Sequence, residues 1–284
     1  MVVGPTMRRR RLGADLRRLR EGRSLRLDEV AGRLGVVAST LSRIETGKAP
    51  TRAGYLSIML DLYGVTDVVQ RQALAELARE GQRKGWWAEC EDVLPAGGGT
   101  YLGLEADALA IRVFAVQVVP GLVQTPDYAR AVIAAGRPEL SAVQADRLVC
   151  AQLRRQEVLG EPAPAEFRLV LDESVLLRRV GSRAVMAGQL RHLAGLAGHP
   201  AVTLQVLGLA ADGRPVPPGS FSVLSFAEPG DADVACGEGL RGQVLLADRD
   251  ADVRPVRAMF DALSACALPA ERSARLIADL MAGA

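Results

Sequence analysis

The chain has 284 residues, of which 49% are hydrophobic and 24% are charged. This length and composition fit one large or two ordinary globular domains and exclude an intrinsically disordered chain. The net charge of +2 conceals two opposite parts: residues 1–85 carry 17 basic and 9 acidic side chains, whereas the rest carry 18 and 24, giving nets of +8 and −6. The basic first part favours a polyanionic partner, although a basic surface that is only solvated would give the same count.

The cysteines and histidines are scattered along the sequence, and no two cysteines form a C-x-x-C pair: Cys90, Cys150, Cys236, Cys266, His192 and His199. A zinc site requires clustered thiolates and imidazoles, so we expect no metal site and no cofactor. Isolated cysteines are typical of small buried residues in a reducing compartment. Because the sequence has no apolar run long enough for a membrane span or a signal peptide, we expect a cytoplasmic protein without a membrane partner.

Residues 12–80 carry apolar side chains at helical spacing, as at Leu12 and Leu16. Turn residues interrupt this pattern at residues 22–24, 35–37, 47–50 and 64–66. Interruptions this close together predict helices of about 8–12 residues, with a fifth helix over residues 68–82. We therefore predict an all-α domain of five helices over residues 1–82.

Residues 83–100 are typical of a linker, because they contain Pro95 and a run of three glycines at residues 97–99. We expect the adjacent Trp86 and Trp87 to dock this linker on one of the domains. The glycines are not followed by Gly-Lys-Ser/Thr, which argues against a loop that cradles phosphate.

Residues 101–284 mix both types of element. Runs of β-branched and apolar residues predict strands at residues 111–119, 167–171, 202–206 and 221–226, the last of them half-buried because it alternates. Apolar spacing, with Thr125 and Ser141 as candidate N-caps, predicts helices over residues 126–136, 141–159, 182–198, 252–266 and 269–281. This order predicts an α+β domain with a small antiparallel or mixed sheet.

The most informative segment is residues 25–63, where two short helices are predicted on either side of Gly35 and Val36. The second helix, about residues 38–46, buries Leu41 and Ile44. The side chains that face outward are Ala38, Ser39, Ser42 and Arg43, and Thr40 lies near the edge of this outward face. Small residues allow close approach to base edges in a DNA major groove, and an arginine pairs with guanine through two hydrogen bonds. A solvated helix surface would also be polar, but this combination favours reading of DNA bases.

Three motifs in this region resemble the XRE, or lambda-repressor-like, helix-turn-helix family: L-x-x-L-R at residues 16–20, E-V-A-x-R-L-G at residues 29–35 and S-T-L-S-R-I-E-x-G at residues 39–47. The resemblance covers residues 12–66 and implies that the helix at residues 38–46 reads the major groove. By position it places Ala38, Ser39, Thr40 and Arg43 toward bases, and Arg26, Thr46, Lys48 and Arg52 toward phosphates. It further implies a structural ion pair between Arg20 and Glu45, and a homodimer with two recognition helices about 34 Å apart.

The sequence departs from this family at its helix starts. Val37 stands where Ser or Thr usually caps the recognition helix, Arg26 where a polar cap is usual, and Leu27 where glutamine is common. Loss of such a cap typically costs about 1 kcal/mol and removes a candidate phosphate contact. The four arginines at residues 8–11 are interpreted either as a disordered solubilising tail or as a flexible basic arm that adds salt-dependent affinity.

The rest of the chain resembles one group of actinobacterial regulators, over about residues 85–281. The motifs are G-W-W-A-E at residues 85–89, Y-L-G-L-E-A at 101–106, I-R-V-F at 111–114, V-P-G-L-V-Q-T-P-D-Y-A-R-A at 119–131, L-R-R-Q-E at 153–157 and V-T-L-Q-V-L at 202–207. This group joins the helix-turn-helix to a domain of uncharacterised function. Its members are described as antitoxin-like regulators, often encoded beside a small partner protein. The resemblance implies that residues 101–284 sense a small-molecule effector or bind a small protein.

Four residues of the second domain are candidates for a ligand or partner site: Arg112, Gln124, Tyr128 and Arg154. Ordinary packing and surface exposure explain them equally well. The turn at residues 120–127 leads into a helix start that is able to bind an anion, although a structural turn is the more common interpretation. Asp172 and Glu173 form either a carboxylate pair or the start of a helix.

We expect no enzyme activity and assign no catalytic residue. His192 and His199 do not form the H-E-x-x-H motif of a zinc peptidase, and no G-x-S-x-G nucleophile elbow occurs. The sequence favours a DNA-binding transcriptional regulator whose second domain is controlled by a ligand or small protein. The alternative is an antitoxin-like interaction module that neutralises or sequesters a small partner protein.

Overall fold

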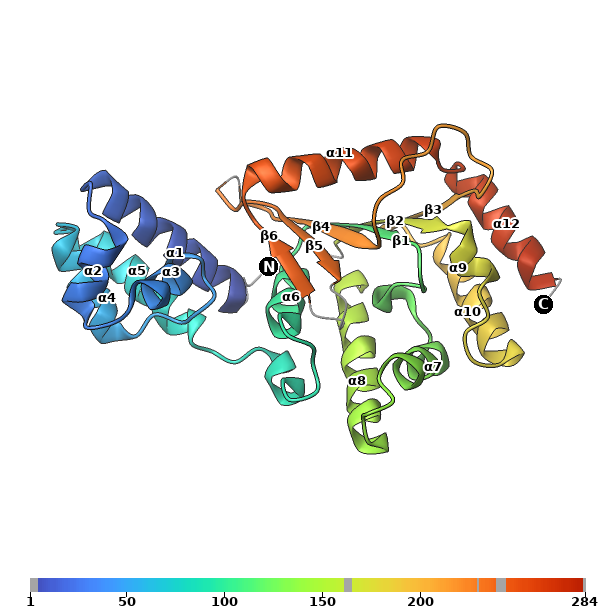
Figure 1. Ribbon diagram of the computed structural model, residues 1–284, viewed down its shortest axis with the longest axis horizontal. Coiled ribbons are helices and arrows are strands. Elements are labelled where there is room, and N and C mark those ends of the chain that lie inside the picture. The colour runs from blue at the N-terminus through green and yellow to red at the C-terminus, as the bar shows by residue number, and fades with distance from the viewer. Residues whose placement is uncertain (1–4, 161–164, 229, 239–243, 283–284) are drawn as a thin grey trace. The chain divides into compact units, whose positions relative to one another are not determined.

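The computed structural model describes residues 5–160, 165–228, 230–238 and 244–282. The chain divides into two compact units, Met1–Ala88 (unit 1) and Glu89–Ala284 (unit 2), whose elements are labelled in Figure 1. A 3-10 helix, η1 (Trp86–Cys90), spans the division, and α6 (Gly98–Glu105) follows it. The segment predicted as a linker, residues 83–100, therefore contains helical turns.

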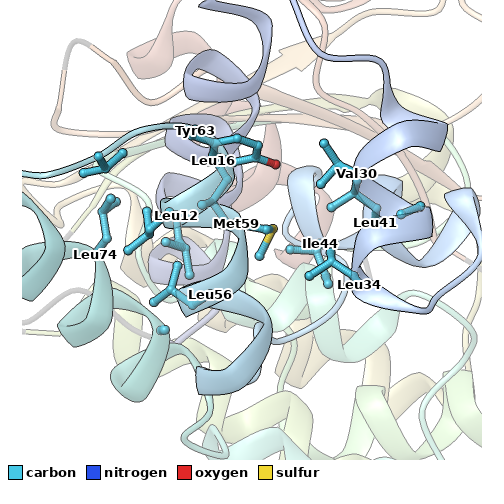
Figure 2. Packing of buried hydrophobic residues seen from close by; sticks show 14 residues of the cluster. Leu12, Leu16, Val30, Leu34, Leu41, Ile44, Leu56, Met59, Tyr63 and Leu74 are labelled. Atoms are coloured by element: carbon cyan, nitrogen blue, oxygen red, sulfur yellow. The ribbon is translucent and has the colours of Figure 1, made fainter. Parts of the chain in front are cut away.

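Over its described residues, 5–88, unit 1 contains five α-helices: α1 (Pro5–Gly22), α2 (Leu27–Leu34), α3 (Ala38–Glu45), α4 (Ala53–Leu62) and α5 (Val68–Gly81). The predicted all-α class of this part is confirmed. One buried hydrophobic cluster takes side chains from all five helices (Figure 2), and Leu16, Leu41 and Met59 are each 0% exposed. Burying a side chain of this size contributes roughly 1.5–3 kcal/mol, so the shared cluster holds the helices against one another.

The first helix begins earlier than its apolar spacing indicates. Residues 8–11, predicted as a flexible arm or a disordered tail, lie inside α1, and Met7 just before them is 1% exposed. The guanidinium of Arg8 donates to the Glu80 carboxylate of α5 at 2.6 Å. The expectation of an arm or tail is therefore wrong, since these residues are helical and one of them is paired with α5. The local sequence does not indicate this pairing, because Glu80 lies 72 residues further along the chain.

A sharp turn joins α2 to α3 in the manner that the sequence predicts. Gly35 adopts a left-handed backbone with φ 68°, and the Val36 amide donates to the Ala31 carbonyl at 3.0 Å. Only a residue without Cβ adopts this conformation without strain, so the glycine ends α2. The chain then re-enters a helix at Ala38.

In the part of unit 2 that the structure describes, six strands form one mixed sheet: β1 (Ala110–Ala115), β2 (Glu166–Asp172), β3 (Val202–Leu207), β4 (Phe221–Ser225), β5 (Val234–Glu238) and β6 (Val244–Ala247). The strand order is β3-β2-β1-β4-β5-β6. The first three strands are parallel, as expected when helices connect consecutive strands, and the last three continue the sheet as antiparallel neighbours. The predicted α+β class is confirmed, and the sheet is of the mixed kind.

Helices lie on both sides of this sheet: α7 (Pro126–Gly136), α8 (Ala142–Arg155), α9 (Glu173–Leu177), α10 (Arg183–Leu196), α11 (Asp250–Cys266) and α12 (Ala270–Ala282), with 3-10 turns η2 (Gly121–Val123) and η3 (Gln156–Leu159). Figure 1 shows α11 along one face and α6, α8 and α10 on the other. On the α11 side, Phe114 and Val170 of the sheet pack against Phe260 and Leu263, all at most 2% exposed.

Capping residues mark several of these helices, as the sequence predicts. Thr125 accepts from the Tyr128 amide at the start of α7, and Ser141 forms a full capping box with Gln144 at the start of α8. The predicted helix over residues 141–159 is shorter than expected, because its last turn tightens into η3. The strand at residues 221–226 is not half-buried: Ser222 is 6% exposed because β4 lies inside the sheet.

Candidate nucleic-acid interface

The helix α3 has one buried and one open side. Leu41 and Ile44 are 0% and 2% exposed and face the hydrophobic cluster of unit 1. On the other side Ser39 and Arg43 are exposed, and Thr40 and Ser42 are partly exposed. This side therefore offers hydroxyl groups and one guanidinium, which are the donors and acceptors that read base edges.

Ala38 differs from the other predicted base-facing residues. It is partly buried and packs against the hydrophobic cluster, because it lies on the first turn where the chain leaves that cluster. Part of its methyl group is therefore covered by the hydrophobic cluster of unit 1.

The turn after α3 is held by main-chain hydrogen bonds. The Lys48 and Ala49 amides both donate to the Arg43 carbonyl, at 2.8 and 3.0 Å, and Gly47 has φ 68°. Lys48 is exposed at this turn, as a phosphate contact requires. The hydroxyl of Thr46 already donates to the Ser42 carbonyl at 2.8 Å, so it must rotate away from the helix to donate to a phosphate.

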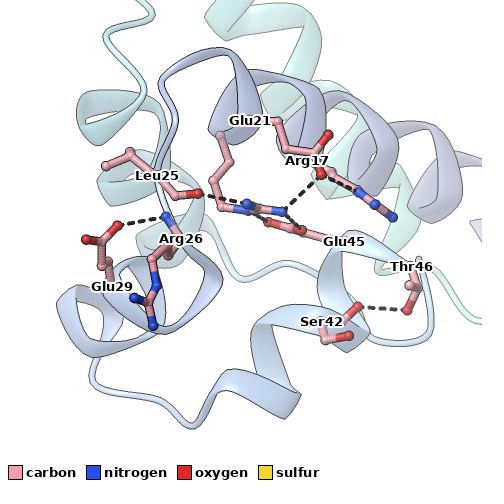
Figure 3. A network of polar contacts seen from close by, with 9 residues as sticks. Arg17, Glu21, Leu25, Arg26, Glu29, Ser42, Glu45 and Thr46 are labelled. Atoms are coloured by element: carbon pink, nitrogen blue, oxygen red, sulfur yellow. Dashed lines mark hydrogen bonds and ion pairs between the residues drawn. The ribbon is translucent and has the colours of Figure 1, made fainter.

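Glu45 lies on the inner side of α3 and is joined to Arg20 of α1 by two hydrogen bonds, Nε to Oε1 at 2.7 Å and Nη2 to Oε2 at 2.9 Å. Figure 3 shows Glu45 in this network, with Arg17, Glu21 and Leu25 nearby. The carboxylate raises the pKa of Arg20. Because Glu45 is 6% exposed and neutralised by this arginine, it presents no repulsive charge to a phosphate backbone.

The start of α2 is also polar. The Arg26 amide donates to Glu29 Oε2 at 2.7 Å (Figure 3), which supplies half of a capping box although Arg26 itself has no side-chain acceptor. The Arg26 guanidinium donates to both oxygens of Asp28, at 3.1 and 2.7 Å, and lowers the pKa of that carboxyl. A predicted phosphate contact is therefore held by a neighbouring carboxylate in this structure.

Arg52 is the remaining predicted phosphate contact. It is exposed at the N-cap position of α4, and its guanidinium lies 5.9 Å from the ring centre of Tyr55. Such stacking fixes the direction of the side chain without consuming its donors.

The four candidates of unit 2 do not form one site. The buried Gln124 and Tyr128 meet at Val119, where the Gln124 amide donates to the carbonyl at 2.6 Å and the Tyr128 hydroxyl accepts from the amide at 3.2 Å. Arg112 lies on β1 and donates to the Ser225 hydroxyl, and Arg154 is on the exposed side of α8. Gln124 and Tyr128 thus hold the main chain at Val119 in place.

Two polar features of unit 2 involve side chains to which the sequence analysis assigned no role. Arg155 makes two hydrogen bonds to Glu105, at 2.7 and 2.8 Å, and stacks on Tyr101. Gln189 donates to the Val123 carbonyl and accepts from the Thr125 amide. Each joins segments that are distant in sequence, so a local pattern gives no signal for them.

Asp172 starts α9, as one of the two interpretations of Asp172 and Glu173 has it. Its carboxylate accepts from the Ser174 amide at 3.1 Å and from the Arg214 guanidinium at 2.7 Å. Glu173 accepts instead from the Leu209 amide. Within the described ranges, no three of the His, Cys, Asp and Glu side chains are grouped so as to hold a metal ion.

The buried–exposed division of α3, the glycine turn before it and the five-helix core define unit 1 as a helix-turn-helix domain. Comparison with family models agrees: residues 11–74 match the family described as helix-turn-helix domain, and residues 99–279 match the family described as domain of unknown function (DUF5753). The chain belongs to the DUF5753 family and carries an XRE-like helix-turn-helix domain at its N-terminal side. The predicted XRE-like helix-turn-helix domain, followed by a domain of uncharacterised function, is confirmed.

Neither a curated protein nor a solved structure matches the chain. The helix-turn-helix domain suggests a DNA-binding regulator. In the part of the chain that the structure covers, no helix combines the length and the apolar character that crossing a membrane requires.

Proposed function

We propose that the protein is a transcriptional regulator that binds double-stranded DNA sequence-specifically, with α3 in the major groove. The observation that carries this proposal is the exposure of Ser39 and Arg43 on one side of a helix whose opposite side is buried. The net charge of +8 on residues 1–85 supports it, because phosphate neutralisation supplies most of the sequence-independent affinity.

Four cationic or hydroxyl groups would fix the domain on the phosphates: Arg26, Thr46, Lys48 and Arg52. The exposure of Lys48 and Arg52 at the two ends of the α3–α4 turn supports this assignment. Base reading would fall to Ser39, Thr40, Ser42 and Arg43, with Ala38 allowing close approach. We further propose a homodimer, which would place two copies of α3 about one DNA turn apart.

The test is DNA selection by the purified full chain. A randomised duplex library is enriched on the protein, and affinity for the enriched duplex is measured by fluorescence anisotropy over a salt series. We expect a specific duplex whose preferred base is lost in Arg43→Ala. Arg18→Ala is the matched control, since Arg18 is a helical arginine with a side chain 77% exposed on α1. Recovery of no duplex at low salt would refute the proposal.

We also propose that unit 2 controls DNA binding by taking up a ligand or a small protein. Support comes from its separate core and from the net charge of −6 after residue 85, which favours a basic or neutral protein surface. The same charge supports the alternative, in which the chain neutralises or sequesters a small protein. Mass spectrometry of the chain purified from its native cells tests both, because a stoichiometric companion is expected and a sample without one contradicts them.

We propose no catalytic role and a cytoplasmic location. The sequence contains neither of the hydrolase motifs H-E-x-x-H and G-x-S-x-G. A regulator of transcription acts where the DNA lies, which supports the location.

A further inference from the structure

Val37 occupies the N-cap position of α3 without acting as a cap. Its backbone is extended, with φ −77° and ψ 151°, and its side chain makes no capping hydrogen bond. Valine is among the poorest N-cap residues because it has no acceptor for the free amides of the first turn. Elsewhere the chain uses effective caps, since Thr125, Ser141 and Ser182 each accept from a main-chain amide.

The isopropyl group of Val37 is also open to solvent. The residue is 66% exposed, whereas its neighbour Val36 packs against the hydrophobic cluster of unit 1. Val37 is not among the residues that pack against this cluster, so its side chain faces solvent. The Thr40 amide donates to the Val37 carbonyl at 2.9 Å, which ties Val37 to the first turn of α3, beside Ser39.

Two local costs thus coincide at one position: an uncapped helix start and an exposed apolar side chain. A β-branched residue has few χ1 rotamers, so its methyl groups are held in nearly fixed positions. In the major groove the apolar feature of a base pair is the 5-methyl group of thymine, which cytosine and uracil lack.

We propose that Val37 is a specificity-determining residue that contacts the 5-methyl group of a thymine at the edge of the site read by α3. The inference rests on the proposed DNA binding by α3 and adds to it a named base and a named atom. The side chain would recover in the complex the apolar contact that it lacks in the free protein.

The experiment uses the full chain and the duplex enriched from a randomised library. Each thymine of the bound site is replaced singly by deoxyuridine, which removes one methyl group and leaves pairing and charge unchanged. With wild-type protein we expect one position in each half-site to lower affinity about fourfold, the value of one buried methyl-sized group. With Val37→Ser the same replacement has no effect.

Val69→Ser is the matched control, because Val69 is a valine of the same unit with 73% exposure, on α5. This variant should keep the wild-type response to deoxyuridine. Val37→Ser introduces a serine cap, so its thermal midpoint should equal or exceed that of the wild type, and unfolding does not explain a lost response.

The failures are distinguishable. If the wild-type chain enriches no duplex, the proposed function fails. If it binds a duplex but no single thymine methyl group affects affinity, or the effect persists in Val37→Ser, the role of Val37 is refuted while DNA binding stands.

Discussion

Gly13 of α1 lies directly against the main chain of Ile44. A Cβ atom at Gly13 would be 2.5 Å from the Ile44 carbonyl oxygen and 2.6 Å from that of Glu45. Real Cβ atoms do not approach backbone oxygens so closely, and main-chain atoms have no side-chain rotamer through which to withdraw. The close contact of α1 with the end of α3 therefore depends on glycine, and it sets how α3 lies in unit 1.

Gly13→Ala should destabilise unit 1 although alanine is the better helix former. The expected loss is about 1–3 kcal/mol from overpacking, larger than the roughly 1 kcal/mol of helix propensity gained. Urea unfolding followed by circular dichroism measures it. Gly32→Ala on α2 is the control: nothing lies within 4 Å of its Cβ position, so this change should stabilise. Equal effects of the two substitutions would contradict the steric explanation.

Arg20→Met should lower the free energy of unfolding by about 3–5 kcal/mol, because it leaves the 6% exposed Glu45 carboxylate without its partner. The double variant Arg20→Met/Glu45→Met should recover much of this loss, since no unpaired charge remains buried. Denaturant unfolding of the four proteins gives the coupling energy. Additive effects of the two single substitutions would show that the pair is not coupled.

Asp28→Asn should tighten DNA binding. The substitution removes a negative charge from the start of α2 and releases the Arg26 guanidinium that donates to Asp28. The salt dependence of the affinity should steepen by about one released counterion. Asp61→Asn is the comparison, because Asp61 is likewise paired with an arginine, Arg71 of α5, and is not one of the proposed DNA contacts or a partner of one. An equal gain from both variants would indicate a general charge effect.

Stability should depend on the protonation of His192 on α10. Burial lowers the pKa of its imidazole from the usual 6.5, so the folded protein binds the proton more weakly than the unfolded chain. The contribution of His192 to the free energy of unfolding is therefore fully present above pH 6.5, and the free energy of unfolding decreases as the pH falls below 6.5. His192→Gln should weaken the drop in unfolding free energy between pH 7.5 and 5.5. An unchanged pH dependence would show that His192 does not contribute.

Elements with local signals were predictable from the sequence. The N-cap residues Thr125 and Ser141 indicate the starts of two helices, and Gly35 indicates the turn before α3. The strands β5 and β6 were missed because they are four or five residues long and one contains Gly237. Such short strands are defined by pairing with neighbours in the sheet, which no local periodicity records.

The candidate site was predictable to the extent that it is helical. The spacing of Leu41 and Ile44 determines which side of α3 is buried, and this leaves Ser39 and Arg43 outside. The contacts of side chains with distant partners were not predictable. Tyr128 was predicted as a candidate for a ligand or partner site. In the structure its hydroxyl accepts from the Val119 amide, a contact that the sequence does not reveal.

The only tryptophans of the 284-residue sequence are Trp86 and Trp87, which stack edge to face with ring centres 6.0 Å apart at the last residues of unit 1. Intrinsic emission at long excitation wavelengths thus originates wholly at this junction. This emission does not change when the sheet unfolds or when DNA binds to α3, unless the surroundings of the two tryptophans change as well. A spectral change on adding an effector or a duplex would accordingly be a direct optical readout of communication along the chain.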